Sequence, residues 1–251
     1  MKYETVDSAA FSGIRLSVLS DPHLREGIGT YKEKKLHLIL KRYFVRSEDA
    51  LEVPFRGFVC DGKEGDLITE VMTTSLSGMD GKLAAFLPDC RVNIIFPLTV
   101  EDRVIWIDPL TGETTPGRRS PKKENLNRLL SELVFILDRL SSPNLTVSAV
   151  YIAADDYRIL NGRGADRKIK AEKAERVPTE IRSIVSYDTA SDMKLFLPEG
   201  LPVKFTRADF SRATRLTGRR LWGAIKVLVE TGVIRDSGEG RKPIFYERVP
   251  E

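Results

Sequence analysis

The stretch GFVCDGKEGDLITEVMTTSLSGMDGK, residues Gly57–Lys82, has the pattern of two short strands followed by the start of a helix. A glycine-containing turn, Gly62–Gly65, separates the two strands. Asp61 closes the first strand, and Glu70 lies in the middle of the second. Carboxylates on adjacent strands of a small sheet are a common way to hold a divalent metal ion. These two acids are therefore the first candidates for a functional site.

Glu70 is the more informative of the two acids. Successive side chains of a strand point to opposite faces, so Ile68, Glu70 and Met72 share one face. Glu70 is then a single carboxylate among apolar neighbours in a central strand. Burying a carboxylate costs free energy unless it is paired or bound to a metal ion. This cost is the main reason to expect a site here.

A helix precedes this stretch. Thr30 has the character of an N-cap, and Glu33, three residues later, completes a capping box. An apolar stripe follows on one helix face, at Leu36, Ile39, Leu40 and Tyr43. Glu33 leans over the same face, so it is either a capping residue or an additional acid of the site.

The rest of the chain alternates strands and helices. Strands are expected at Arg91–Leu98, Arg103–Asp108 and Leu145–Ala153. A long helix is expected from Ser120 to Leu140. This alternation predicts an α/β sheet between helices over residues 1–178. Residues 179–203, which contain several prolines, are interpreted as a linker or bridging helix, and residues 204–251 as a second domain.

Composition limits the class of protein. The chain has 251 residues, 41% of them hydrophobic and 30% charged, which is typical of a soluble globular protein. No run approaches the ~20 apolar residues of a membrane span, and no secretory signal is recognised, so we expect a cytoplasmic protein without a membrane partner. The two cysteines are expected to be reduced. Two histidines argue against a His-rich zinc site and against a Ser-His-Asp triad.

Basic charge is concentrated late in the sequence. Leu201–Glu251 contains 11 Lys/Arg against 6 Asp/Glu, a net charge of +5, whereas the whole chain carries +4. Gly162–Pro178 contains 6 against 3, a net charge of +3. This distribution favours a polyanionic partner; the alternative for Gly162–Pro178 is a solvated helix face.

The segment Phe205–Val249 shows two short helices with a tight turn, followed by a hairpin with a glycine-rich, basic tip. It resembles the winged helix-turn-helix family, which implies that the Thr217–Thr231 helix enters a DNA major groove and that Arg235–Pro243 is the wing. The basic residues that the resemblance places against DNA are Arg215, Arg219, Arg220, Arg241 and Lys242. Trp222 is expected in the core. The alternative use of such a module is dimerisation or contact with another protein, so a homodimer stays open.

Gly27–Phe96 resembles the PD-(D/E)xK, or restriction-endonuclease-like, nuclease superfamily. The resemblance implies the order helix, three strands, helix and strand, with acidic residues that bind Mg²⁺ or Mn²⁺. Asp61 and Glu70 match the two metal carboxylates, and Glu33 matches the acid of the first helix.

The sequence departs from this superfamily at one position. The lysine expected two residues after Glu70 is replaced by Met72, which carries no charge. In some members the lysine lies on the following helix, and Lys82 matches that position. Lys63, in the turn after Asp61, is the other candidate.

The sequence therefore predicts a restriction-endonuclease-like mixed sheet flanked by helices, with a small C-terminal winged helix domain. The expected function is Mg²⁺-dependent hydrolysis of DNA phosphodiester bonds, with Asp61, Glu70, Lys82 and Glu33 as the catalytic group. One alternative is a non-catalytic winged-helix DNA-binding regulator with a degenerate nuclease-like domain. Another is an interaction scaffold that binds no nucleic acid.

Overall fold

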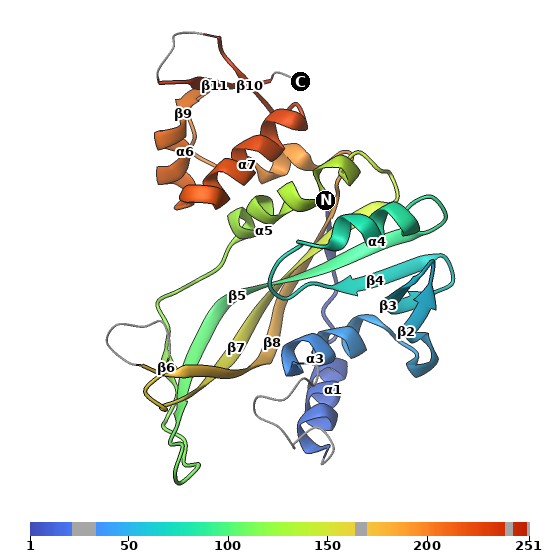
Figure 1. Cartoon of the computed structure of the whole chain (residues 1–251), viewed down its shortest axis with the longest axis vertical. Helices are drawn as coiled ribbons and strands as arrows, with labels where there is room; N and C mark the ends of the chain where they lie inside the picture. Colours follow the sequence, from blue (N-terminus) through green and yellow to red (C-terminus); the bar gives the residue numbers. More distant parts are fainter. Residues whose placement is uncertain (22–33, 164–169, 239–242, 250–251) are drawn as a thin grey trace.

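A large mixed sheet with helices on both faces forms the centre of the protein (Figure 1). The computed structural model describes residues 1–21, 34–163, 170–238 and 243–249. The strands are β1 (Lys2–Glu4), β2 (Leu51–Phe55), β3 (Phe58–Glu64), β4 (Leu67–Val71), β5 (Arg91–Ile107), β6 (Arg118–Arg119), β7 (Leu145–Ile159) and β8 (Glu172–Asp188). They are hydrogen-bonded in the order β1-β8-β7-β5-β4-β3-β2, with β6 on β5. The expected α/β class, a mixed sheet between helices, is confirmed.

Six elements, consecutive except for the short 3-10 helix η1 (Glu48–Ala50) after the first of them, position the candidate site. They are α3 (Lys35–Phe44), the strands β2, β3 and β4, then α4 (Met79–Phe86) and β5. The pairs β2–β3 and β3–β4 are antiparallel, as the two tight turns between them require. β4 pairs in parallel with β5, and α4 makes the crossover that a parallel pair needs.

The long strands β5, β7 and β8 form the spine of the sheet. β5 has 17 residues and runs through the segment where the sequence predicts a break between two strands. The pairing register with β7 shifts between Thr99 and Glu101, so a bulge keeps the strand continuous there. β8 also has 17 residues and extends past residue 178, where the sequence places the start of the linker, to Asp188.

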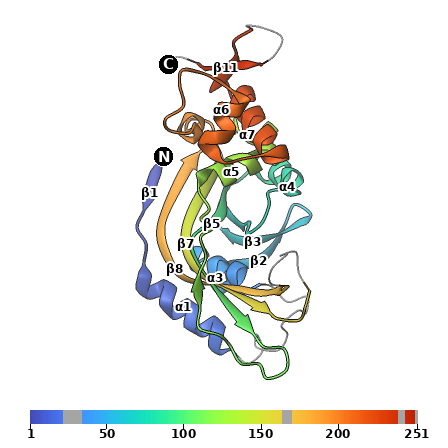
Figure 2. The same cartoon turned by 90° about the vertical axis from the view of Figure 1, so that its left-hand side faces the viewer.

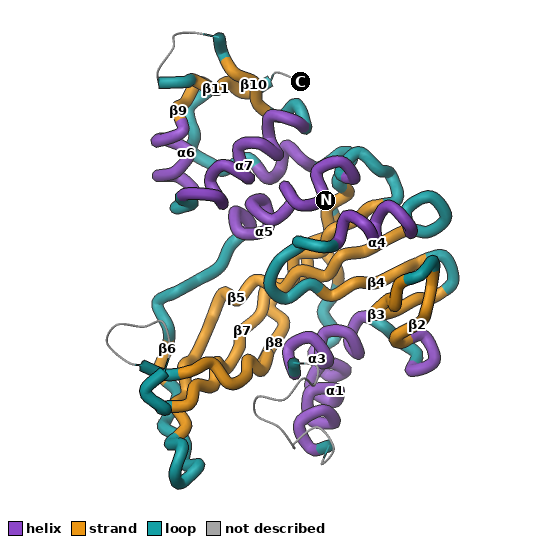
Figure 3. Tube along the Cα trace, in the orientation of Figure 1, coloured by secondary structure: helices purple, strands orange, loops and turns teal. Residues whose placement is uncertain are grey.

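Both faces of the sheet are covered, which explains the apolar run of β5. Helices α1 (Ser8–Ser20) and α3 pack on one face, where Phe11, Ile39 and Ile95 are buried together. On the other face lie α4, α5 (Leu126–Glu132) and the 3-10 helix η2 (Leu133–Arg139), with Leu83 and Leu129 in the second buried cluster (Figure 3). Alternate residues of β5 therefore meet apolar side chains on both sides.

The C-terminal part forms a small module of its own. Its elements are β9 (Lys204–Thr206), α6 (Arg207–Thr214), α7 (Gly218–Glu230), β10 (Ile234–Asp236) and β11 (Phe245–Arg248). The three strands form an antiparallel sheet in the order β10-β11-β9. Thr206 and Asp209 form a capping box at the start of α6. Figure 2 shows this module at one end of the large sheet, next to α5.

Close helix packing fixes the C-terminal module against the sheet. A Cβ atom at Gly223 of α7 would lie 3.1 Å from the Ser131 carbonyl oxygen and 3.1 Å from Val134 Cγ1. Glycine therefore allows α7 to approach α5 and η2 more closely than another residue would. The buried side chains of α7 join the cluster that α4 and α5 share, so one core connects the module to the sheet.

None of the helices in the described ranges is long and apolar enough to cross a membrane.

Candidate active site

Asp61 lies where the pairing of β3 with β4 ends. The ladder runs from Glu64↔Leu67 to Gly62↔Thr69 and stops one residue before Asp61. There the Val71 backbone amide of β4 donates a hydrogen bond of 2.8 Å to Asp61 Oδ2. The carboxylate thus acts as the acceptor at the position where the two strands separate, which fixes its orientation.

Glu70 is buried, with 1% of its surface exposed. Its Oε2 accepts a hydrogen bond of 2.8 Å from Lys82 Nζ, and its Oε1 is buried without a hydrogen-bond partner among the described residues. Burial raises the pKa of Glu70 above its ordinary value, Lys82 opposes the rise, and the negative charge of Asp61 adds to it. Lys82 therefore supplies the positive charge that a buried carboxylate requires, but Glu70 Oε1 lacks a hydrogen-bond partner among the described residues.

Lys82 is held by two strands at once. Its Nζ donates to Glu70 on β4 and also to the Val59 carbonyl oxygen on β3, each at 2.8 Å. α4 begins after Gly78, whose φ of +88° suits glycine and lets the chain turn into the helix that carries Lys82. Sequence analysis placed Lys82 on this helix as the replacement for the missing lysine, and the structure brings its ammonium group to Glu70.

The loop before α4 is fixed by α5. The buried Glu132 carboxylate accepts hydrogen bonds from Ser75 Oγ at 2.6 Å and from the Leu76 amide at 3.2 Å. Since this loop joins the strand of Glu70 to the helix of Lys82, Glu132 helps to set their relative position.

His37 of α3 is a site residue that the sequence analysis missed. Its Nε2 lies 3.1 Å from Asp61 Oδ2. Burial alone would raise the pKa of Asp61, but the hydrogen bond and charge of His37, with the Val71 amide, lower it below its ordinary value. The sequence feature that could have indicated His37 is its position on an amphipathic helix beside the apolar stripe. Its contact with Asp61, 24 positions away, depends on tertiary packing and cannot be read from the sequence.

One turn further along α3, Lys41 places a second cation at the same sheet. Lys41 is only 2% exposed, and its Nζ lies 2.7 Å from Glu52 Oε1. Glu52 has a φ of +53°, a strained conformation for a residue with a side chain. Glu52 of β2 and Asp61 of β3 therefore face partners on α3, and Glu70 of β4 faces a partner on α4.

The other candidates from the sequence do not join this group. Met72 is partly buried against the core and cannot replace a lysine. Lys63 Nζ donates to the Gly65 carbonyl oxygen at 2.6 Å and lies 5.0 Å from the centre of the Phe55 ring. Glu33 lies outside the described residues, so its expected role as a fourth member of the site stays a prediction.

A metal ion at this site would have the Asp61 and Glu70 carboxylates as its ligands. No group of three or more His, Cys, Asp or Glu side chains that could hold a metal is found in the described ranges. Two carboxylates are available, and the unsatisfied buried oxygen of Glu70 is suited to a cation. Mg²⁺ is commonly held by one or two carboxylates and keeps several waters, so Asp61 and Glu70 are the residues that would hold such an ion.

Three of the predicted DNA contacts in the C-terminal module, Arg215, Arg219 and Arg220, are exposed. Arg215 lies in the turn between α6 and α7 with a φ of +60°, and Arg219 and Arg220 lie in the first turn of α7. No side-chain hydrogen bond or ion pair engages these three arginines in the part of the chain that the structure describes. The predicted DNA contacts Arg241 and Lys242 lie outside the described residues.

Trp222 overturns an expectation. The sequence predicts a core position for this residue, but 53% of its surface is exposed. Leu221, Ile225 and Leu228 form the buried stripe of α7, and Trp222 points about 100° away from Leu221 around the helix.

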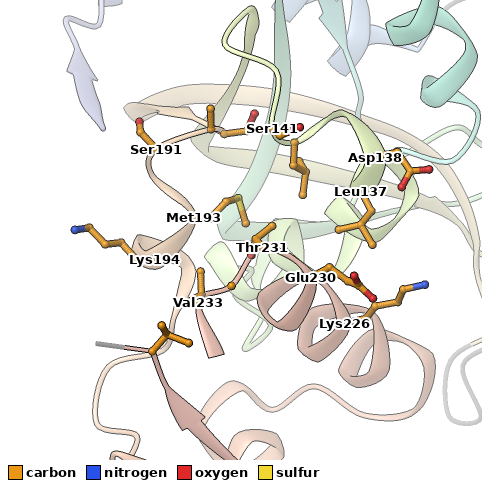
Figure 4. Close-up of a pocket in the computed structure, with 15 residues that line it drawn as sticks. Leu137, Asp138, Ser141, Ser191, Met193, Lys194, Lys226, Glu230, Thr231 and Val233 are labelled. Atoms are coloured by element: carbon orange, nitrogen blue, oxygen red, sulfur yellow. The ribbon is translucent and has the colours of Figure 1, made fainter. Parts of the chain in front are cut away.

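A large hollow lies away from the two carboxylates. It has a volume of about 850 Å³ and lies between η2, the 3-10 helix η3 (Met193–Phe196) and the end of α7 (Figure 4). Its lining is mixed, with Lys226 and Glu230 on one side and Met193 and Val233 on another. Neither Glu70 nor Lys82 lines it, so the hollow is not part of the candidate site.

Comparisons with known proteins identify one similar protein and one matching family model. An uncharacterized protein from Treponema pallidum (strain Nichols) is 26% identical over 226 residues, which cover 89% of this chain and 88% of the relative. No solved structure matches the chain. Residues 34–188, from the start of α3 to the end of β8, match the model of a family described as a domain of unknown function (DUF8091). Because this match spans more than half of the sequence and includes His37, Asp61, Glu70 and Lys82, the chain belongs to that family.

Proposed function

We propose that this protein binds DNA and hydrolyses its phosphodiester bonds with Mg²⁺ or Mn²⁺ at Asp61, Glu70 and Lys82. The observation that carries the proposal is the 2.8 Å contact between Lys82 Nζ and the buried Glu70 carboxylate. The order α3-β2-β3-β4-α4-β5 agrees with the helix, three strands, helix and strand of the PD-(D/E)xK superfamily. A lysine on the second helix then compensates for Met72.

Each residue has a role in this proposal. Asp61 and Glu70 would hold the metal ion, which activates water and neutralises charge on the phosphate when it is bound. Lys82 orients the attacking water and stabilises the negative charge that develops on the phosphate oxygens. His37 keeps Asp61 oriented and lowers its pKa, so that its carboxylate is available as a ligand.

The C-terminal module supports DNA binding in this proposal. The order β9-α6-α7-β10-β11, with a three-stranded sheet, resembles a winged helix-turn-helix domain. α7 would enter a major groove, and the β10–β11 hairpin would be the wing. Arg215, Arg219 and Arg220 are exposed and have no carboxylate partner among the described residues, as expected of side chains that contact phosphate or base edges.

Plasmid nicking tests the proposal. The wild type and Glu70→Ala are incubated with supercoiled plasmid in Mg²⁺ and in Mn²⁺. The wild type is expected to nick and Glu70→Ala to be inactive, while Glu180→Ala, which removes an exposed carboxylate of β8, should retain activity. Equal nicking by the wild type and Glu70→Ala, or nicking by neither, would contradict hydrolysis at this site.

A second candidate is a DNA-binding regulator without catalysis. It is favoured by the fact that the described residues form no group of three metal ligands, and that Lys82 already occupies one oxygen of Glu70. It predicts duplex binding that persists in EDTA and is unchanged in Glu70→Ala, but is lost in Arg219→Ala/Arg220→Ala. Absence of salt-dependent binding to any duplex would exclude both candidates.

A further inference from the structure

An exposed tryptophan lies in the middle of the face that α7 presents to solvent. Trp222 is 53% exposed, although tryptophan is normally among the more buried residue types. Lys226 Nζ, one turn further along α7, lies 5.3 Å from the centre of the indole ring. The indole is therefore a rigid aromatic surface with a cation near it.

Basic residues continue this face on the other side of Trp222. Arg219 lies one turn before it on α7, and Arg215 lies in the preceding turn of the chain. Neither arginine has a side-chain partner in the described ranges. No Asp or Glu occurs between Asp209 and Glu230, so the whole stretch is free of negative charge. Arg215, Arg219, Trp222 and Lys226 are together called the α7 face.

This combination is suited to a nucleic acid with an unpaired base. Proteins bind single-stranded nucleic acid by stacking bases on aromatic side chains while cationic side chains follow the backbone. Inside an intact duplex both faces of each base are covered by its neighbours, so an indole has no base face to stack on except at the two ends. An overhang, gap or single strand offers that face.

We propose that the α7 face binds DNA that carries an unpaired base, with the base stacked on Trp222 and the adjacent phosphates on Arg219 and Arg215. The proposal rests on the DNA binding proposed above and specifies its substrate class: single-stranded DNA or a junction between single and double strands. Loss of one stacked base lowers affinity by about 5- to 150-fold.

Two DNA probes distinguish this proposal from plain duplex binding. One is a blunt duplex, and the other is the same duplex with a short oligothymidine overhang. Trp222→Ala is expected to lose about 5- to 150-fold in affinity for the overhang probe while its affinity for the blunt duplex changes little. Trp222→Phe should recover most of the loss, because phenylalanine also stacks. Leu110→Ala, which removes an exposed apolar side chain elsewhere, is the matched control.

Fluorescence gives a second readout. The chain contains two tryptophans, so Trp106→Phe leaves Trp222 as the single emitter. Oligothymidine should quench that emission, and the blunt duplex, in which only the terminal base pairs expose a face, should quench it far less. An equal effect of Trp222→Ala on both probes, or no effect on either, overturns the stacking proposal while DNA binding stands. Failure of the wild type to bind either probe at low salt overturns the proposed DNA binding as well.

Discussion

Removal of the Lys82 ammonium group tests the role of the ion pair in the fold. Lys82→Met keeps most of the side-chain volume and leaves the buried Glu70 carboxylate without its 2.8 Å partner. Breaking a buried ion pair by removing one partner costs about 3–5 kcal/mol. The Lys82 side chain is 24% exposed, so the lower end, about 3 kcal/mol, is expected. With a slope of about 3 kcal/mol per molar urea, the unfolding midpoint should fall by about 1 M.

The effect should depend on pH in a defined direction. The pKa of Glu70 in the folded protein is already raised, mainly by burial, and loss of Lys82 raises it further. When folding raises the pKa of a carboxyl group, that group stabilises the folded state at pH values below its pKa in the unfolded chain. This stabilisation is lost as the pH rises through the pKa that the group has in the folded protein. The destabilisation by Lys82→Met should therefore be larger at about pH 7.5 than at about pH 5.

The assay is equilibrium unfolding in urea at both pH values, with EDTA present to exclude metal ions. Lys63→Met is the matched control, because the Lys63 ammonium contacts a carbonyl oxygen and a ring rather than a buried acid. The double variant Lys82→Met/Glu70→Gln should be more stable than Lys82→Met alone, since no charge is left buried without a partner. A loss below about 0.5 kcal/mol, or an equal loss at both pH values, would refute the reasoning.

Three further outcomes are expected. Asp61→Asn should destabilise the protein above about pH 5, because the lowered pKa of Asp61 favours the folded state when the carboxylate is ionised. The difference in stability from the wild type should shrink as the pH falls below about 4, where the carboxylate becomes protonated. Urea unfolding across this pH range measures the difference. Gly223→Ala should lower the free energy of unfolding by about 1–3 kcal/mol, because the new Cβ atom would lie 3.1 Å from a backbone carbonyl oxygen. Gly13→Ala, in open space on α1, should raise the free energy of unfolding by about 0.5–1 kcal/mol in the same urea experiment. Arg219→Ala/Arg220→Ala should lower the slope of log K against log salt for duplex DNA by about 2, and an unchanged slope would remove both arginines from the contact surface.

The order of elements around the site could be predicted from the sequence. The strand around Glu70 and the helix that carries Lys82 are local patterns, and the structure has both. The glycine turn predicted at Gly62–Gly65 is wrong: β3 continues to Glu64 and the chain turns at Gly65, so Asp61 lies inside β3 and does not close it. The α/β class follows from the same patterns. The position of Lys82 on the following helix came from a family resemblance and not from a local pattern.

The remaining features depend on packing that no local pattern records. The contact of His37 with Asp61 requires α3 to pack on the face of the sheet that carries β4, and the two residues are 24 positions apart. β5 was predicted as two strands because Thr99 to Asp102 interrupts the apolar run, but a bulge absorbs these residues within one strand. Trp222 was assigned to the core by its residue type, whereas the buried face of α7 is set by the contact of Gly223 with α5.

Single-turnover cleavage of an end-labelled DNA duplex in Mg²⁺, by the wild type and by Glu70→Gln, tests the proposed chemistry most directly. Glutamine keeps the size of the side chain but removes the charge that would hold the metal ion, and circular dichroism can verify that the variant is folded. Cleavage by the wild type and a rate at least about 100-fold lower in Glu70→Gln is the result that hydrolysis at this site predicts. Equal rates for the two proteins, or no cleavage by the wild type in either Mg²⁺ or Mn²⁺, would contradict it.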